Sequence, residues 1–216
     1  MKLAVLGATG PSGQELVKDA LARGHQVIAL VRSPEKLAEI KHDNLQVHRV
    51  DIFNPQDLAP HFKGCDAVLS GLGQRGLLLP FTKTTFYEDS VKSIVTGMRE
   101  ANITRFLCIT SWCTEYGPDN PKIMEWIVKP LFIGRHLTSM AVMENYLFNE
   151  CPDINYTIVR PPQLTNGPSV GTEMHTAQGQ FVPKRSPMIT RADVAKFMLN
   201  CLTTDQWDRK AVSIAP

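Results

Sequence analysis

Short apolar runs and amphipathic stretches alternate along the chain. The runs have the length and apolar character of buried strands and lie at residues 3–6, 26–31, 45–50, 67–70, 105–110, 156–160 and 211–214. The stretches repeat apolar residues at helical spacing and lie at residues 14–21, 89–101, 137–148 and 190–202. Strands that alternate with helices predict a parallel sheet with helices on both faces. We therefore expect an α/β fold, a doubly wound, Rossmann-like parallel sheet that forms a single domain over residues 1–216.

Three glycines follow the first apolar run directly. Gly7, Gly10 and Gly13 stand between that strand and the first predicted helix, with Thr9 and Ser12 among them. Glycine permits a tight turn and a close approach of the backbone to a pyrophosphate, and the helix N-terminus presents free N–H groups to the anion. In this context the spacing G-x-x-G-x-x-G predicts a dinucleotide cofactor and redox chemistry. The alternative is a tight structural turn that binds no ligand.

The residues after the second apolar run indicate which dinucleotide binds. In this fold an acidic residue there bonds the ribose of NAD, whereas a basic residue accommodates the additional phosphate of NADP. Arg32 follows the run directly and Lys36 stands four residues further on. Arginine is suited to bidentate phosphate recognition, so we expect NADP(H) as the cofactor.

Further candidate cofactor contacts follow the third and fourth runs. Asp51 and Ile52 are expected at the adenine, the carboxylate on the exocyclic amine and the aliphatic side chain on the ring. Asp51 has an alternative role as the cap of a helix that begins near Pro55. After the fourth run, Leu72 and Gly73 let the backbone pass along the cofactor, and Arg75 is expected to reach a phosphate or an acidic substrate.

The fifth and sixth runs end at the expected nicotinamide position. Ser111 is the candidate catalytic residue, because its hydroxyl can polarise a substrate or orient a water molecule. The alternative is a serine at a strand end that caps the local backbone. Ile109 just before it, and Pro162 and Gln163 after the sixth run, are expected to contact the cofactor.

An acid–base pair common in dehydrogenases of this kind is missing. Such enzymes use Tyr-x-x-x-Lys, in which the lysine lowers the pKa of the tyrosine. The residues four positions after Tyr87, Tyr116, Tyr146 and Tyr156 are Val91, Asn120, Glu150 and Arg160. This absence favours a hydride acceptor that takes its proton from solvent, such as a flavin, a quinone or a conjugated tetrapyrrole.

Composition excludes several classes of protein. The 216 residues are 43% hydrophobic and carry a net charge of +2, which predicts neither a nucleic-acid partner nor a membrane surface, and no apolar run is long enough to span a bilayer. We expect no leader before the first strand, and the five scattered cysteines favour reduced thiols without a metal site, so we expect a cytoplasmic protein. Cys113 near the expected active site is either a reactive thiol or a core residue.

Two stretches interrupt the alternation, at residues 112–136 and 163–187, and we expect both to cover the substrate. The first contains a strongly apolar part at residues 116–135. This part is a lid, a dimer contact, or an amphipathic segment packed on the sheet. We expect a monomer or a weak homodimer.

Several short motifs together carry a family resemblance. They are Gly7-Ala8-Thr9-Gly10, Leu30-Val31-Arg32, Leu72-Gly73-x-Arg75, Thr110-Ser111, Pro161-Pro162 and the stretch from Phe197 to Asp205. In these the chain resembles the flavin reductase (NADPH), or biliverdin IXβ reductase, family of atypical short-chain dehydrogenases. The resemblance implies NADPH as hydride donor and flavin or linear tetrapyrrole acceptors, with Arg32 on the 2′-phosphate and Ser111 in the active site. Gln163 stands where that family carries a histidine.

Two other functions remain as alternatives. A redox-sensing regulator similar to NmrA-like proteins would bind the dinucleotide without turnover and present an apolar surface to a partner, with residues 126–133 as the candidate surface. An epimerase- or isomerase-like activity is disfavoured, because that chemistry needs the missing tyrosine base.

Overall fold

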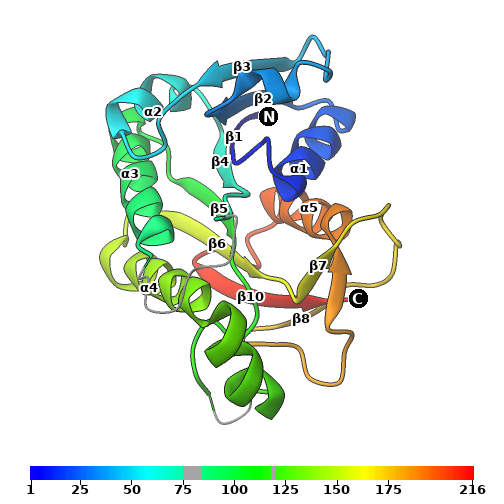
Figure 1. Cartoon of the computed structure of the whole chain (residues 1–216). Coiled ribbons are helices and arrows are strands. Elements are labelled where there is room, and N and C mark those ends of the chain that lie inside the picture. The colour runs from blue at the N-terminus through cyan, green and yellow to red at the C-terminus, as the bar shows by residue number, and fades with distance from the viewer. Residues whose placement is uncertain (75–83, 118–119) are drawn as a thin grey trace.

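The seven apolar runs and one further short strand form one sheet of eight strands in the computed structural model, which describes residues 1–74, 84–117 and 120–216 (Figure 1). The strands lie in the order β3-β2-β1-β4-β5-β6-β10-β8. They comprise β1 (Lys2–Leu6), β2 (Gln26–Val31), β3 (Leu45–Arg49), β4 (Ala67–Ser70), β5 (Arg105–Ile109), β6 (Asn155–Arg160), β8 (His175–Ala177) and β10 (Lys210–Ala215). All neighbours pair in parallel except β8, which runs antiparallel to β10 at the edge. The predicted α/β fold with a doubly wound sheet is confirmed.

Helices cover both faces of this sheet. On one face lie α1 (Pro11–Ala22) and α5 (Arg191–Asn200), and on the other α2 (Pro55–Phe62), α3 (Phe86–Ala101) and α4 (Gly134–Glu150) (Figure 1). Short elements complete the chain: the 3₁₀ turns η1 (Pro34–Leu37) and η3 (Cys201–Thr203), the π-helical η2 (Met124–Ile133), and a two-stranded parallel ladder of β7 (Gln163–Thr165) and β9 (Met188–Thr190). None of the helices in the described ranges is long and apolar enough to span a bilayer.

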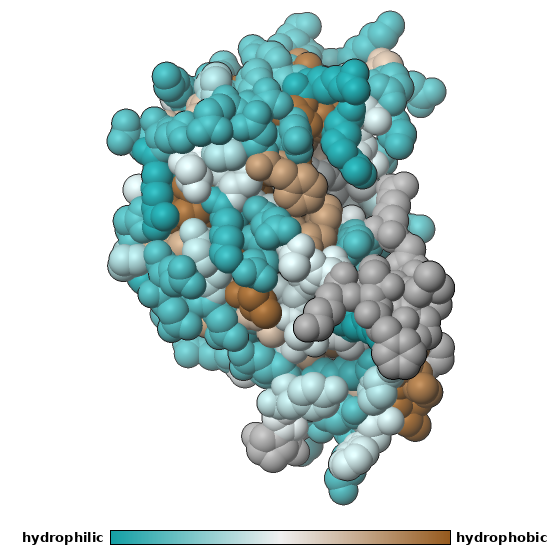
Figure 2. Space-filling view, turned by 60° about the vertical axis from the view of Figure 1, so that its left-hand side comes forward, coloured by the Kyte–Doolittle hydropathy of each residue, from teal (hydrophilic) through white to brown (hydrophobic). Residues whose placement is uncertain are grey.

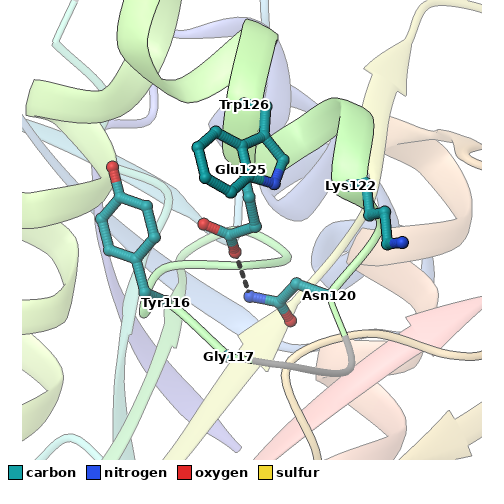
Figure 3. Close-up of a pocket in the computed structure, with 6 residues that line it drawn as sticks. All are labelled: Tyr116, Gly117, Asn120, Lys122, Glu125 and Trp126. Atoms are coloured by element: carbon teal, nitrogen blue, oxygen red, sulfur yellow. Dashed lines mark hydrogen bonds between the residues drawn. The ribbon is translucent and has the colours of Figure 1, made fainter.

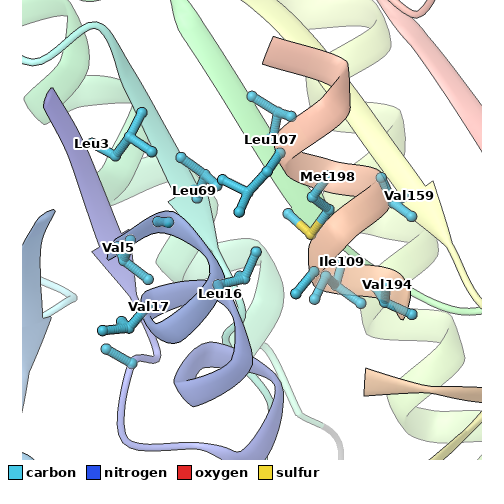
Figure 4. Packing of buried hydrophobic residues seen from close by; sticks show 14 of the residues in the cluster. Leu3, Val5, Leu16, Val17, Leu69, Leu107, Ile109, Val159, Val194 and Met198 are labelled. Atoms are coloured by element: carbon cyan, nitrogen blue, oxygen red, sulfur yellow. The ribbon is translucent and has the colours of Figure 1, made fainter. Parts of the chain in front are cut away.

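Alternate strand residues fill two cores, one under each helical layer. Leu3 and Val5 of β1 pack toward α1 and α5, whereas Ala4 and Leu6 pack toward α2 and α3. Figure 4 shows the first core, where Met198 of α5 lies over the central strands. Successive strand side chains point to opposite faces, and a sheet covered on both faces buries all of them. This explains why the strands are continuous apolar runs in the sequence.

The observed helix ends follow local chemistry. The hydroxyl of Thr190 accepts the N–H of Asp193 at 3.1 Å and donates to its carboxylate at 2.7 Å, so Thr190 caps α5 as its position predicts. Hydrogen bonds from Ser169 and Thr190 hold the pKa of Asp193 below its usual value, although burial of this carboxyl alone would raise it.

Strands β7, β8 and β9 have three residues each, too few for a pattern of apolar positions to reveal them.

The apolar stretch at residues 116–135 packs on the sheet only in part, since Met124 contacts a small core cluster that includes Ala215 of β10. Residues 124–133 form η2, which leads into α4 and projects at the lower end of the molecule (Figure 1). Trp126 and Leu131 are 79% and 67% exposed, so the expectation of an amphipathic segment buried against the sheet is wrong for them. Whether residues 112–136 and 163–187 cover a substrate stays a prediction.

The strand order creates a crevice at the carboxyl ends of β1 and β4. The chain moves from β1 outward to β2 and β3, then returns to the other side of β1 as β4. The loops after β1 and β4 therefore diverge, and ligands of doubly wound sheets bind in the crevice between them.

Candidate functional site

Glycines bring the loops after β1 and β4 into contact. Gly7 has a φ of +73°, and a Cβ on it would lie 2.7 Å from the carbonyl carbon of Gly71. A Cβ on Gly13 would overlap the carbonyl group of Gly7. No side chain fits at Gly7 or Gly13, so the glycine motif has a steric cause in this structure. Gly71 was not predicted; its place directly after a buried strand is the signal that could have identified it.

The N-terminus of α1 opens into the same crevice. The N–H of Gly10 bonds the carbonyl of Gly7 at 2.8 Å, and Pro11 begins the helix with no side chain capping it. The N–H groups of Ser12 and Gly13 lie in the first turn and have no partner within the helix. Together with the helix dipole they can bind an anion such as a pyrophosphate.

A cleft of about 240 Å³ runs from this loop across the strand ends. Of the predicted cofactor contacts, it is lined by Gly10, Ser12, Leu72, Gly73 and Ile109. Residues from three loops far apart in the sequence thus converge on one space. Thr9 belongs to the same loop as Gly10, whereas Arg75 lies outside the described residues.

Arg32 and Lys36 lie beyond the cleft, after β2. Both side chains are exposed, and within the described ranges neither has a hydrogen-bond or ion-pair partner. Two unpaired cations next to the edge of the crevice fit a phosphate on the adenosine half of a dinucleotide.

The structure corrects the expectations at the end of β3. Asn54 caps α2, because its side chain accepts the N–H of Gln56, so the capping role of Asp51 is wrong. The Asp51 carboxylate instead accepts the N–H of Phe53 at 3.0 Å. Ile52 is only 4% exposed and belongs to the core, whereas Phe53 is 47% exposed. Phe53 rather than Ile52 therefore offers an apolar face to a base, and the adenine contact of Asp51 stays a prediction.

Ser111 lies one residue beyond Thr110, which lines the cleft. It is half-buried, and its hydroxyl bonds none of the described residues, so it does not cap the local backbone. The hydroxyl is thus available to a ligand, and its catalytic role stays a prediction.

A buried ion pair underlies this part of the cleft. Glu144 of α4 is fully buried and accepts two bonds from Arg160 of β6, at 3.1 Å from Nε and 2.6 Å from Nη2. The hydroxyls of Thr110 and Thr114 donate to the same carboxylate at 2.7 Å and 2.9 Å. One carboxylate thereby fixes both ends of the turn that contains Ser111.

The sixth strand ends at Arg160 as predicted, but the backbone after it is paired in a way that the sequence did not reveal, and the cofactor contacts of Pro162 and Gln163 stay predictions. Pro162 is buried, and the N–H of Gln163 donates to the carbonyl of Pro187 at 3.0 Å, so this N–H is not free for a nicotinamide. The neighbouring Leu164 lines the cleft instead. The short ladder between β7 and β9, which the sequence did not reveal, causes this difference.

Three side chains that sequence reasoning missed also line the cleft: Tyr87 of α3, Met140 of α4 and Arg191 of α5. The hydroxyl of Tyr87 accepts the N–H of Gln74 at 3.2 Å, and burial raises the pKa of Tyr87. This phenol therefore keeps its proton and can donate it to a ligand in a hydrogen bond. Arg191 bonds the side chain of Asn166 at 2.7 Å and brings a positive charge to the cleft.

Proton-transfer groups are scarce in the cleft. Among its described lining residues only Tyr87 and Arg191 carry ionisable side chains. Burial raises the pKa of Cys113 to about 11, so this thiol is a core residue and not a reactive thiolate. In the part of the chain that the structure describes, no three His, Cys, Asp or Glu side chains are grouped to hold a metal ion.

Comparison with known proteins agrees with this geometry. The profile of a family described as NAD(P)H-binding matches residues 7–205. The chain is 25% identical to a protein of Bacillus subtilis (strain 168) named an uncharacterised sugar epimerase, over 99% of this chain and 94% of that one. Two solved structures share the fold. One is a short-chain dehydrogenase/reductase of Veillonella parvula DSM 2008 in complex with NADP, with a TM-score of 0.78, 18% identity and coverage of 100% and 93%. The other, from Streptococcus pneumoniae TIGR4, is described as a candidate NADH-flavin reductase, with a TM-score of 0.73, 23% identity and coverage of 100% and 99%.

Proposed function

Because this chain belongs to the NAD(P)H-binding family, we propose that it is an NADPH-dependent reductase that acts on flavins or biliverdin-like tetrapyrroles. The glycine loop and the open N-terminus of α1 fit the pyrophosphate of a dinucleotide, since the contacts at Gly7 and Gly13 leave room for no side chain there. Bound NADPH would supply a hydride, and the residues of the chain would bind and orient the two substrates.

One observation carries the choice of acceptor: the described residues that line the cleft include no acid–base pair. Met140 occupies the α4 wall, the phenol of Tyr87 is held protonated by burial, and no lysine is among the described residues that line the cleft. A ketone or alcohol substrate needs a proton to move with the hydride. A flavin, quinone or conjugated tetrapyrrole accepts the hydride and takes its proton from water, so this cleft supports such an acceptor.

Arg32 and Lys36 support NADPH over NADH. Both cations are exposed beside the end of β2, where this fold places the adenosine ribose. A 2′-phosphate there would gain charge-assisted hydrogen bonds.

Arg191 supports an acceptor with an acidic group. Its guanidinium lies at the N-terminus of α5 in the cleft wall, and an arginine fork matches a phosphate or carboxylate. FMN carries a phosphate and biliverdin carries carboxylates, whereas riboflavin carries neither. The name of the S. pneumoniae relative is consistent with a flavin acceptor.

The direct test is NADPH consumption by the purified protein, with FMN, biliverdin and a simple quinone each offered as acceptor and NADH as the control donor. Turnover with NADPH on FMN or biliverdin supports the proposal. An Arg191→Gln variant should raise KM for FMN about tenfold or more and leave KM for riboflavin nearly unchanged, because only FMN presents a phosphate. Equal effects on both flavins would contradict the role of Arg191.

A redox-sensing regulator is the second candidate, and one observation favours it. Trp126 and Leu131 expose a large apolar surface on η2, which a protein partner could cover. This function predicts tight NADPH binding with no turnover on any of the three acceptors. The same assay therefore separates the two functions.

We place either activity in the cytoplasm. All five cysteines are unpaired and buried, as expected for a protein kept in a reducing compartment.

A further inference from the structure

The helix η2 buries charged side chains and exposes apolar ones, which is the reverse of the usual pattern for a helix at the surface of an isolated protein. Lys129 is 2% exposed, bonds the carboxylate of Glu125 at 2.7 Å and donates to the carbonyl of Glu115 at 2.8 Å. Trp126, one residue after Glu125, is 79% exposed. A helix on the surface of a globular protein buries its apolar face and exposes its charges. Here the charges are buried and paired, whereas Trp126, Ile127 and Leu131 lie outside.

Five exposed apolar side chains lie in or near η2, and we call them the outer face: Tyr116, Ile123, Trp126, Ile127 and Leu131. Their exposed fractions run from 48% for Ile127 to 79% for Trp126. In Figure 2 brown apolar atoms lie at one edge of the lower lobe, where η2 lies in Figure 1, beside pale and teal ones. With about 200 Å² for a fully exposed aromatic side chain and somewhat less for an aliphatic one, the outer face presents roughly 600 Å². That is the upper end of what monomeric proteins expose, and patches of this size mark interaction sites.

A hollow of about 510 Å³ lies beside this ridge (Figure 3). Tyr116 and Trp126 stand at its sides, and Lys122 lies at its edge. Between them the amide of Asn120 donates to the Glu125 carboxylate at 2.5 Å. The volume of the hollow is in the range of pockets that take a drug-sized molecule, so an indole ring fits within the hollow.

We propose that the outer face is the interface of a symmetric homodimer, in which Trp126 of each copy enters the hollow of the other. A two-fold axis places the same patch on both sides of an interface, so such a patch must be complementary to itself. A ridge directly beside a hollow has this property, because the rotation sets each ridge over the opposite hollow. Large aromatic side chains in pockets supply most of the energy of such interfaces.

The exposed area of the outer face agrees with a second copy of this chain as the partner that covers it. A standard interface buries about 800 Å² on each partner, of which somewhat more than half is apolar. The outer face supplies roughly that apolar share, and Lys122 at the edge of the hollow is exposed and supplies polar surface. The net charge of +2 on each chain gives little repulsion between two copies.

A membrane surface fits these observations less well. Helices that lie on membranes keep a broad basic face toward the lipid headgroups and water. The basic residue of η2, Lys129, is buried and neutralised by Glu125, so the segment has no such face.

Sedimentation velocity over about 1 to 100 µM tests the proposal. We expect the wild type to sediment with twice the chain mass of 24.1 kDa. Trp126→Lys and Leu131→Lys should each weaken association about a hundredfold or more, which matches loss of a central contact on both sides of the interface. Val170→Lys is the matched control, because Val170 is equally apolar, 64% exposed and outside the outer face.

Tryptophan emission gives a second readout of the same event. Trp112 and Trp207 are buried in each chain, so dilution of the wild type should shift the emission to the red by exposing Trp126. Unchanged far-ultraviolet circular dichroism would show that the variants remain folded.

Two results would overturn the proposal. One is a wild type of 24.1 kDa at every concentration, including a monomer that instead binds vesicles of phosphatidylcholine and phosphatidylserine. The other is a Trp126→Lys variant that dimerises as tightly as the Val170→Lys control.

Discussion

Replacement of Glu144 by glutamine tests how the turn of Ser111 is held. Glu144 is fully buried, and its two oxygens accept four hydrogen bonds, two from Arg160 and one each from Thr110 and Thr114. Glutamine has nearly the same shape, but it replaces one acceptor oxygen with an NH₂ donor and removes the negative charge. Arg160, only 4% exposed, is then left without a counterion and faces a second donor.

The expected cost follows from this geometry. Breaking a buried pair by removing one partner costs about 3–5 kcal/mol, because the remaining charge is buried and uncompensated. That is a large fraction of the free energy of unfolding of a typical domain, which is about 5–15 kcal/mol. A double variant, Glu144→Leu with Arg160→Met, should regain most of the loss, since a buried pair replaced by apolar residues of similar volume is often neutral. Its remaining deficit should come from the Thr110 hydroxyl, which loses its acceptor.

Urea unfolding monitored by circular dichroism measures the free energy of unfolding of the single and of the double variant. The control is Asp153→Asn, which breaks the Arg99–Asp153 pair on the surface, where the side chains are 41% and 46% exposed. That change should cost no more than about 1 kcal/mol. If Glu144→Gln cost as little as this control, the buried pair would not hold the turn and the reasoning would be refuted.

Four further results are expected. Arg32→Ala should raise the Kd for NADPH about ten- to hundredfold and leave that for NADH nearly unchanged, since only NADPH carries the 2′-phosphate; fluorescence titration measures both. Ser111→Ala should lower kcat and leave NADPH affinity nearly intact, which steady-state kinetics with FMN would show. Tyr87→Phe should weaken NADPH binding about tenfold in the same titration, because the donor hydroxyl leaves the cleft. Folding stability should fall as the pH drops from 7 to 5, because burial, and then His48, hold the pKa of His61 below 6.5.

The sign of the pH effect follows from linkage. The unfolded chain protonates His61 near its usual pKa of 6.5, whereas the folded chain protonates it only at lower pH. Stability from this residue is therefore complete above pH 6.5 and is lost as the pH falls toward the lower folded value. His61→Gln should flatten this part of the stability profile relative to the wild type. A variant with the same slope as the wild type would exclude His61 as the cause.

Equal losses of NADPH and NADH affinity in Arg32→Ala would refute the phosphate contact. Unchanged turnover in Ser111→Ala would exclude a catalytic role. For Tyr87→Phe, binding of 2′,5′-ADP, which is the adenosine half of NADPH, distinguishes loss of a direct contact to the cofactor from loosening of the loop at Gln74. If Tyr87 contacts the nicotinamide half, 2′,5′-ADP should bind the variant as tightly as it binds the wild type.

The positions of the strands and of the glycine loop could be predicted from the sequence because their causes are local. A strand buried on both faces must be apolar throughout, and Gly7 and Gly13 are required by the turn itself. The end of β3 shows the limit of such reasoning. Asp51 and Asn54 are both good caps, and only the path of the backbone shows that Asn54 caps α2 and that Ile52 turns into the core.

The walls of the cleft could not be predicted because they come from distant helices. Tyr87, Met140 and Arg191 belong to α3, α4 and α5, and no local pattern distinguishes them from other helix residues. They meet only because the crossovers of the sheet bring the start of each helix to the carboxyl ends of the strands.

The sequence by itself determined the class of fold and the place of the glycine loop, since periodicity and glycine spacing act over a few neighbouring residues. The tertiary structure alone decided which way the apolar stretch at residues 124–133 faces. Periodicity shows which residues share one side of a helix. Contacts with the rest of the protein decide which side faces the core and which faces solvent. Here Lys129 finds the carboxylate of Glu125 and the carbonyl of Glu115 inside the protein, so Trp126 turns toward solvent.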